Sequence, residues 1–311
     1  MALKIDTVEI ATESAKIMSK KRTRIGRVFY GQNGLRIIWS ILLFIALYAF
    51  FDFVTNVVLN RISWLSVTEP ILPTVALVRE SCALATVLGT TFIMSKIERR
   101  NLGSFGYLTK DRLKRFLTGI TIGLLSLSAL IAMMWKFGFI IFTGFSLHGL
   151  DIIIYGGIWA IVFVMIGILE ESIFRGYLQY TLARGIGFWP AALLVSTGFI
   201  LWHLSNKSES ILGLITTGVG SIVFSLSLYY TKSLWWAIGF HAGWDWGQNF
   251  FYGTPDSGII TQGHLFNTHA VGDPFWSGGS VGPEGSAFFL PLLLVVLIGI
   301  WLSWHPKQSR I

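Results

Sequence analysis

The sequence is short of charged residues and of cysteine. Of its 311 residues, 13% are charged and one, Cys82, is a cysteine. Soluble domains contain about 25% charged residues, and disordered chains are charge-rich and poor in aromatic side chains. The deficit therefore argues against a soluble globular enzyme and against disorder. A single cysteine excludes an intrachain disulfide and any metal site built from several cysteines.

Long apolar runs take the place of the missing charge. Hydrophobic residues make up 53% of the chain. An apolar run of about 18 residues or more predicts a membrane span, because a backbone in lipid must satisfy its own hydrogen bonds as a helix. The sequence therefore predicts an all-α, polytopic bundle of about eight transmembrane helices, at 37–58, 71–95, 116–137, 152–182, 189–204, 212–230, 233–252 and 286–304.

The basic residues are distributed unevenly between the predicted spans. A net charge of +8 is compatible with nucleic-acid binding. However, residues 1–35 and 96–115 hold seven Lys or Arg each, five more fall on the same side, and 253–285 contains none. The positive-inside rule then predicts a multi-pass protein of the cell membrane with both termini in the cytoplasm. Anionic lipid headgroups are the expected partners of the basic segments, and no nucleic-acid partner is expected.

Ionisable side chains inside the predicted spans are few, and they are costly in lipid, so they mark candidate functional sites. Arg79 and Glu80 are interpreted as structural, pairing with each other, with Asp52 or with the other polar residues. The remaining candidates are Glu170, Glu171, Arg175, His203, His241 and Asp245.

The densest group is Glu170-Glu171 with Arg175. Glu171 and Arg175 are four residues apart, so they share a helix face and can form an ion pair. Glu170 is rotated by about 100° from Glu171 and has less charge compensation. That difference makes Glu170 the better candidate for a general base acting on water. A buried ion pair that only fixes helix packing is the alternative for Glu171 and Arg175.

Two further predicted spans carry histidines. His203 ends the run from Phe199, and His241 and Asp245 are again four residues apart on one face. A carboxylate beside an imidazole orients the ring and selects its tautomer. Taken singly, each could be a packing or interfacial residue among the tryptophans.

One polar cavity shared by the three segments accounts for these residues better than three separate burials do. Its chemistry would be amide hydrolysis, with Glu170 or Glu171 and His203 activating water. His241 and the surroundings of Asp245 would stabilise the oxyanion. Glu170, His203 and His241 could instead bind a divalent metal such as zinc, although the His-Glu-x-x-His signature is absent. Spacing does not decide between these mechanisms.

At these residues the sequence resembles the CPBP family of intramembrane proteases, named for CaaX proteases and bacteriocin processing and also called the Abi domain. The family pattern Glu-Glu-x-x-x-Arg, Phe-x-x-x-His, His-x-x-x-Asn/Asp occurs in order as Glu170-Glu171 with Arg175, Phe199 with His203, and His241 with Asp245. The segments 174–179 and 231–235 also resemble bacterial members. The resemblance covers roughly residues 150–255.

The resemblance implies an endopeptidase that cleaves membrane-associated protein or peptide substrates. Glu170 with His203 would activate water, Glu171 with Arg175 would support them, and His241 with position 245 would form the oxyanion site. CaaX members typically carry Asn where this chain has Asp245, and an ionised Asp cannot donate to an oxyanion. Asp245 must therefore be protonated, orient His241 or bind a metal, and the substrate stays open.

Three regions follow from these patterns. Residues 1–35 are expected to form a basic cytoplasmic segment, 36–145 the first transmembrane helices with a basic cytoplasmic loop, and 146–311 a CPBP-like catalytic domain. The competing function is a non-enzymatic membrane protein for bacteriocin immunity or for assisting export.

Overall fold

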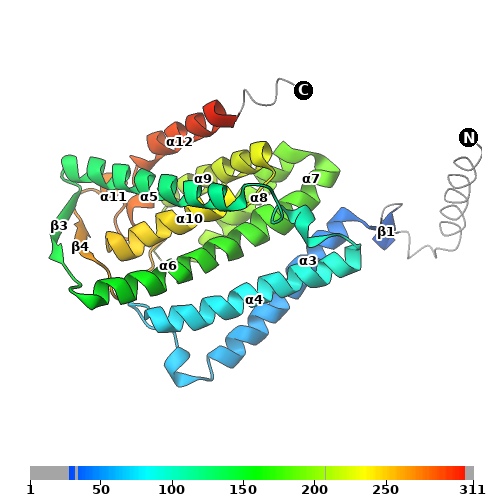
Figure 1. Cartoon of the computed structure of the whole chain (residues 1–311), viewed down its shortest axis with the longest axis horizontal. Coiled ribbons are helices and arrows are strands. Elements are labelled where there is room, and N and C mark those ends of the chain that lie inside the picture. The colour runs from blue at the N-terminus through cyan, green and yellow to red at the C-terminus, as the bar shows by residue number, and fades with distance from the viewer. Residues whose placement is uncertain (1–27, 32–33, 207, 305–311) are drawn as a thin grey trace, which may run out of the picture.

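A computed structural model of the chain describes residues 28–31, 34–206 and 208–304, and these form a bundle of helices (Figure 1). The predicted basic segment at 1–35 lies mostly outside the described residues. The long helices are α3 (Ile37–Leu59), α4 (Pro73–Glu98), α5 (Arg112–Lys136), α6 (Leu150–Glu171), α8 (Phe188–His203), α9 (Ile211–Thr231), α10 (Trp235–Trp246) and α12 (Phe289–Trp304). The all-α prediction is confirmed.

Five stretches are long and apolar enough to cross a membrane, judged by length and composition alone. They are Ile37–Leu59, Pro73–Glu98, Arg112–Lys136, Leu150–Ile186 and Ile211–Thr231. The helices at Phe188–His203 and Phe289–Trp304 are apolar but shorter. Each of the eight predicted spans overlaps a helix, but α10 and these two are shorter than a span requires, so the count of eight stays a prediction.

The span predicted at 152–182 is one continuous helical stretch with a change of winding. After α6 ends at Glu171, the chain continues as the π-helix η3 (Ser172–Gln179) and then as α7 (Tyr180–Ile186). A second π-helix, η4 (Gly247–Phe251), continues α10. π-Helical turns are rare in proteins, and those that do occur are frequently found at functional sites. Both lie next to the predicted site residues.

Close backbone contact between α5 and α10 holds α10 in the bundle. Gly119 and Gly123 of α5 face α10, and Gly239 and Gly243 of α10 face α5. A Cβ atom on Gly123 would collide with the carbonyl oxygen of Phe240. Small residues at this spacing allow two helices to approach closely where lipid provides no hydrophobic drive. The crossing fixes the position of His241, which lies between the two α10 glycines.

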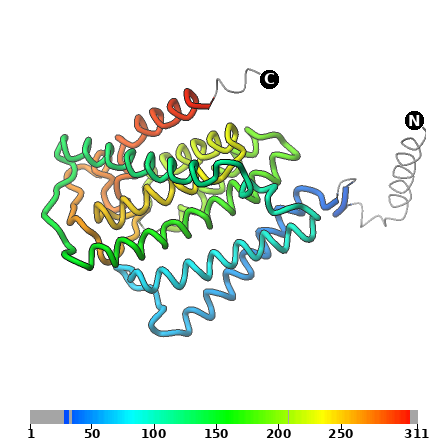
Figure 2. The backbone as a smooth tube through the Cα atoms, viewed as in Figure 1, coloured from blue at the N-terminus to red at the C-terminus, as the bar shows by residue number. Residues whose placement is uncertain are grey.

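Two pairs of short strands lie at opposite ends of the bundle (Figure 1). The strand β3 (Ile140–Phe145) pairs antiparallel with β4 (Phe266–Ala270), while β1 (Tyr30–Gly31) pairs with β2 (Gly34–Leu35). Three 3-10 turns, η1 (Ser63–Leu65), η2 (Leu102–Phe105) and η5 (Pro283–Gly285), and the short α11 (Pro274–Ser277) lie in the connections. The backbone path in Figure 2 shows that β3 and β4 close the same end of the bundle. The segment 253–285 contacts η4, since the backbone nitrogens of Thr254 and Leu265 donate to the carbonyl oxygens of Gln248 and Phe250.

Candidate active site

A cavity of about 450 Å³ opens among α3, α4, α6, α8, α9 and α10. Four of the six predicted site residues line it: Glu170, His203, His241 and Asp245. The other two, Glu171 and Arg175, lie directly behind it and are fully buried. The shared cavity expected from the sequence is therefore present in the fold.

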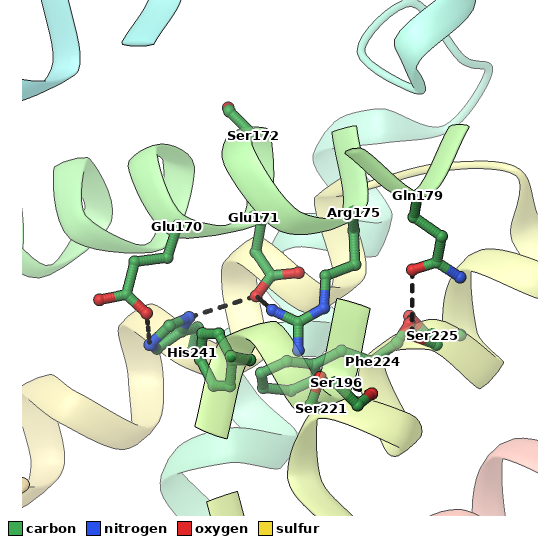
Figure 3. Close-up of polar contacts among 12 residues, drawn as sticks. Glu170, Glu171, Ser172, Arg175, Gln179, Ser196, Ser221, Phe224, Ser225 and His241 are labelled. Atoms are coloured by element: carbon green, nitrogen blue, oxygen red, sulfur yellow. Dashed lines mark hydrogen bonds and ion pairs between the residues drawn. The ribbon is translucent and has the colours of Figure 1, made fainter. Parts of the chain in front are cut away.

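The predicted pair of Glu171 and Arg175 is formed. Nη1 of Arg175 lies 3.0 Å from Oε1 of Glu171, and both side chains are 0% exposed (Figure 3). The guanidinium also lies over the rings of Phe199 and Phe224, at 4.4 and 5.3 Å from their centroids. A cation buried this deeply is stabilised by its carboxylate partner and by the negative faces of the rings.

His241 lies among three carboxylates. Its Nε2 is 3.7 Å from Oε2 of Glu170 and 3.5 Å from Oδ2 of Asp245, while its Nδ1 is 3.4 Å from Oε1 of Glu171. Figure 3 shows Glu170 and Glu171 approaching the ring from the same helix. Oε1 of Glu171 faces Nη1 of Arg175 on one side and Nδ1 of His241 on the other, so the three side chains form a chain of contacts.

His203 lines the same cavity but is held differently. Its Nδ1 lies 2.9 Å from the carbonyl oxygen of Phe199, and its ring is tilted by 53° against the Phe199 ring, with 4.5 Å between the ring centroids. Within 34–206 and 208–304, no hydrogen bond or ion pair joins His203 to Glu170. The nearest histidine contact of Glu170 is with His241, which the sequence assigned to the oxyanion side.

Asp245 is 5% exposed and sits one turn beyond His241, as the spacing predicted. The next turn on the same face carries Asn249, whose Nδ2 donates to the carbonyl oxygen of Asp245 at 3.2 Å. Of the three roles open to Asp245, its position beside Nε2 of His241 favours orienting that ring.

The residues interpreted as structural also reach the cavity. Asp52, Arg79 and Glu80 all line it. Arg79 donates from Nη2 to Oδ1 of Asn56 at 2.7 Å, and Asn56 donates from Nδ2 to Oδ2 of Asp52 at 3.1 Å. Asn56 therefore links Asp52 to Arg79, and together they form one polar wall of the cavity.

Sequence reasoning missed three cavity residues near the segment 253–285, namely Asn249, Asp256 and Glu284. Helical spacing from His241 and Asp245 would have found Asn249. Nothing local marks Asp256 or Glu284, since both lie in irregular segments outside the apolar runs. Burial, and next the charge of Asp256, raises the pKa of Glu284 to about 8. Burial likewise raises the pKa of Asp256 well above its usual value.

The predicted metal ligands were tested against this geometry. Among the residues that the structure describes, no three His, Cys, Asp or Glu side chains converge as a metal-binding group. Both ring nitrogens of His241 face carboxylates, and Glu170, His203 and His241 do not fit a metal in this arrangement. Metal binding stays a prediction, and no step below passes through a metal.

Residues 152–247 match a family model described as Type II CAAX prenyl endopeptidase Rce1-like. No curated protein matches the chain. The matched segment runs from α6 to the start of η4 and includes all six predicted site residues. The resemblance to the CPBP family is thereby confirmed over this segment. The chain contains, at residues 152–247, an Rce1-like domain of the CPBP family of membrane-embedded proteases.

Proposed function

We propose that this protein is an intramembrane endopeptidase that hydrolyses peptide bonds of membrane-associated proteins or peptides with a water molecule activated by glutamate and histidine. The observation that carries the proposal is the meeting of Glu170, His203, His241 and Asp245 at one cavity, from three helices. Such a convergence of costly polar groups inside an apolar bundle supports a chemical role over separate structural ones.

Glu170 is the proposed general base. Its carboxylate lines the cavity and pairs with no Lys or Arg among residues 34–206 and 208–304. His203 assists, because the carbonyl of Phe199 can only accept, so Nδ1 carries the proton. Nε2 of the neutral ring is then an acceptor for a second hydrogen of the same water. Two acceptors lining one cavity orient a water for attack on a carbonyl carbon.

His241 is the proposed stabiliser of the oxyanion, through a hydrogen bond donated from Nε2. Glu171, itself held by Arg175, faces Nδ1 of His241 and fixes the ring from behind. Asp245 beside Nε2 completes the orientation. Water adds its hydroxyl to the carbonyl carbon, and Glu170 takes the proton. The carbon–nitrogen bond then breaks, and Glu170 returns that proton to the leaving amine.

The apolar wall of the cavity supports a membrane-derived substrate. Trp159, Val162, Phe163 and Ile166 of α6 line it on the side of Glu170. A peptide entering from lipid would bury apolar side chains against this wall while its backbone reached the polar groups. The proposal therefore commits to peptides with apolar residues near the cleaved bond.

The test compares cells that express the wild type, Glu170→Gln or Glu69→Gln, and identifies new protein termini in their membranes by mass spectrometry. Glu69 is an exposed acid outside the cavity, so its variant matches the charge change. A substrate found this way is then cleaved by purified protein. Loss of a general base predicts a fall in kcat/KM of about 10²- to 10⁴-fold for Glu170→Gln. Full cleavage by Glu170→Gln would refute the proposal.

The non-enzymatic alternative makes the opposite prediction. A bacteriocin-immunity or export-assisting protein would keep its effect on cells in the Glu170→Gln variant, and no new termini would depend on Glu170. If the cellular effect is instead lost together with cleavage, that alternative fails.

A further inference from the structure

Three acceptor side chains form the end of the cavity that faces segment 253–285. We call Asn249, Asp256 and Glu284 the acidic subsite. Nδ2 of Asn249 donates to Oδ2 of Asp256 at 2.7 Å. Oε1 of Glu284 accepts from the backbone nitrogen of Ser257 and from its Oγ, the latter at 2.7 Å. One oxygen of each carboxylate is thus used inside the protein.

The acidic subsite has a buried acceptor without a partner. Asn249 is 2% exposed and lines the cavity, yet its Oδ1 has no hydrogen-bond partner within the described part of the chain. A buried amide oxygen left unpaired costs free energy unless a ligand satisfies it. The amide nitrogen of Asn249 is occupied by Asp256, whereas the amide oxygen is left to accept from a donor that the described part of the chain does not supply.

Within the described part of the chain, no Lys or Arg forms an ion pair with Asp256 or Glu284. Residues 253–285 contain no Lys or Arg. Asp245 adds a further carboxylate one turn from Asn249. Buried carboxylates without a cationic partner are costly to ionise, and a bound cation favours their ionised form.

We infer that the acidic subsite binds the guanidinium or ammonium group of a basic residue in the peptide substrate. The inference rests on the proposed function for its substrate. A guanidinium has five donors in a planar fork and an ammonium has three, whereas the subsite supplies acceptors. The apolar wall at Trp159 and Phe163 supports a peptide in place of a free ion, because it accommodates the neighbouring side chains.

The distance along α10 and its continuation η4 places the basic residue relative to the cleaved bond. His241, Asp245 and Asn249 are spaced by four residues each, so they occupy successive turns of one face. Eight residues of helix rise about 12 Å. An extended peptide covers about 3.3 Å per residue, so the basic side chain should belong to a residue about three or four positions from the cleaved bond.

The test measures binding without turnover. The probes are two nine-residue leucine- and alanine-rich peptides, acetylated and amidated, with a neutral fluorophore and either one Arg or one citrulline at the same position. Citrulline keeps the shape of Arg and removes its charge. Affinities are measured in neutral detergent for Glu170→Gln alone and for the same protein with Asp256→Asn and Glu284→Gln. The matched control carries Glu69→Gln instead.

The Arg peptide should bind Glu170→Gln about ten- to one hundred-fold more tightly than the citrulline peptide, the range expected for hydrogen bonds to charged groups. The preference should be kept with Glu69→Gln and lost with Asp256→Asn and Glu284→Gln. Equal affinities for the two peptides would overturn the inference whether or not the variants fold. A preference for the Arg peptide that persists in the variant with Asp256→Asn and Glu284→Gln would also overturn the inference. Binding of Ca²⁺ at the subsite without a preference for the Arg peptide would overturn it as well. The binding test needs no cleavage, so its result does not depend on the proposed catalytic activity. Failure of the proposed function is detected separately, in the cleavage comparison of the wild type with Glu170→Gln.

Discussion

The buried pair of Glu171 and Arg175 allows structural and catalytic contributions to be separated by a double-mutant cycle. Both side chains are 0% exposed, and Nη1 of Arg175 lies 3.0 Å from Oε1 of Glu171. In Arg175→Met the carboxylate of Glu171 stays buried and loses its cation. Removing one partner of a buried pair costs about 3–5 kcal/mol, because the remaining charge is left uncompensated.

Neutralising both partners should behave differently. Glu171→Gln combined with Arg175→Met leaves neither member of the pair charged, and Met fills the space against the rings of Phe199 and Phe224. Replacement of a whole buried pair by groups of similar volume is often neutral or stabilising. Glu171→Gln alone leaves the cation of Arg175 buried without its partner and should cost about as much as Arg175→Met. The double variant should recover most of either loss, which gives a coupling free energy of at least about 3 kcal/mol.

The assay is reversible unfolding in mixed micelles, followed by the fluorescence of the 13 tryptophans. Arg61→Met is the matched control, because Arg61 is exposed and the chemical change is the same. The reasoning is wrong if Arg175→Met is as stable as the wild type, or if the double variant is as unstable as Arg175→Met. Activity should stay low in the stable double variant, since Nδ1 of His241 loses the carboxylate that lies 3.4 Å away.

Three further outcomes follow from the same geometry. Gly243→Leu should lower the melting temperature and reduce cleavage at least tenfold, because its side chain collides with the backbone of Ile120 and displaces His241. The control is Gly89→Leu, at an exposed and open position outside the cavity, and equal activity of the two variants would contradict the packing argument. The pKa of Glu284 is raised to about 8 by burial and by Asp256, with Glu209 adding to it. Folded protein therefore binds more protons than unfolded protein between about pH 4.5 and 8, and stability from this group falls as pH rises through that window. Glu284→Gln should melt higher than the wild type at pH 8.5 and similarly at pH 4.5, whereas Glu69→Gln should show no such change. Dialysis against a chelator should leave cleavage unchanged; one zinc ion per chain together with chelator-sensitive cleavage would require a metal mechanism instead.

Local periodicity accounts for what the sequence could predict. The pairs of Glu171 with Arg175 and of His241 with Asp245 depend only on four-residue spacing within one helix, and both contacts are present. The apolar runs likewise predicted helices in the right places, because a span is a property of composition over a single segment. Their ends are less certain, and α10 is shorter than the predicted span at 233–252.

Contacts between helices were harder to predict, because they depend on crossing geometry. Spacing alone could not show that Glu170 faces His241 while His203 bonds to Phe199. A signal for one crossing was nevertheless present in the chain. Gly119 and Gly123, like Gly239 and Gly243, are four residues apart, and this spacing of small residues marks close helix contacts in membranes. Combining it with the position of His241 would have placed α5 behind the site.

The acidic subsite could not be predicted from any single segment of the sequence. Asn249 lies on the face of His241 and Asp245, but its importance depends on Asp256 and Glu284, which reach it from separate connections. Those connections are positioned by the pairing of β3 with β4 and by the contact of Glu284 with Ser257. Absence of Lys and Arg from 253–285 was interpreted only as a topology signal. In the folded protein the same absence leaves Asp256 and Glu284 without a Lys or Arg from their own segment, so one sequence feature bears on both the predicted membrane orientation and the proposed preference for a basic substrate residue.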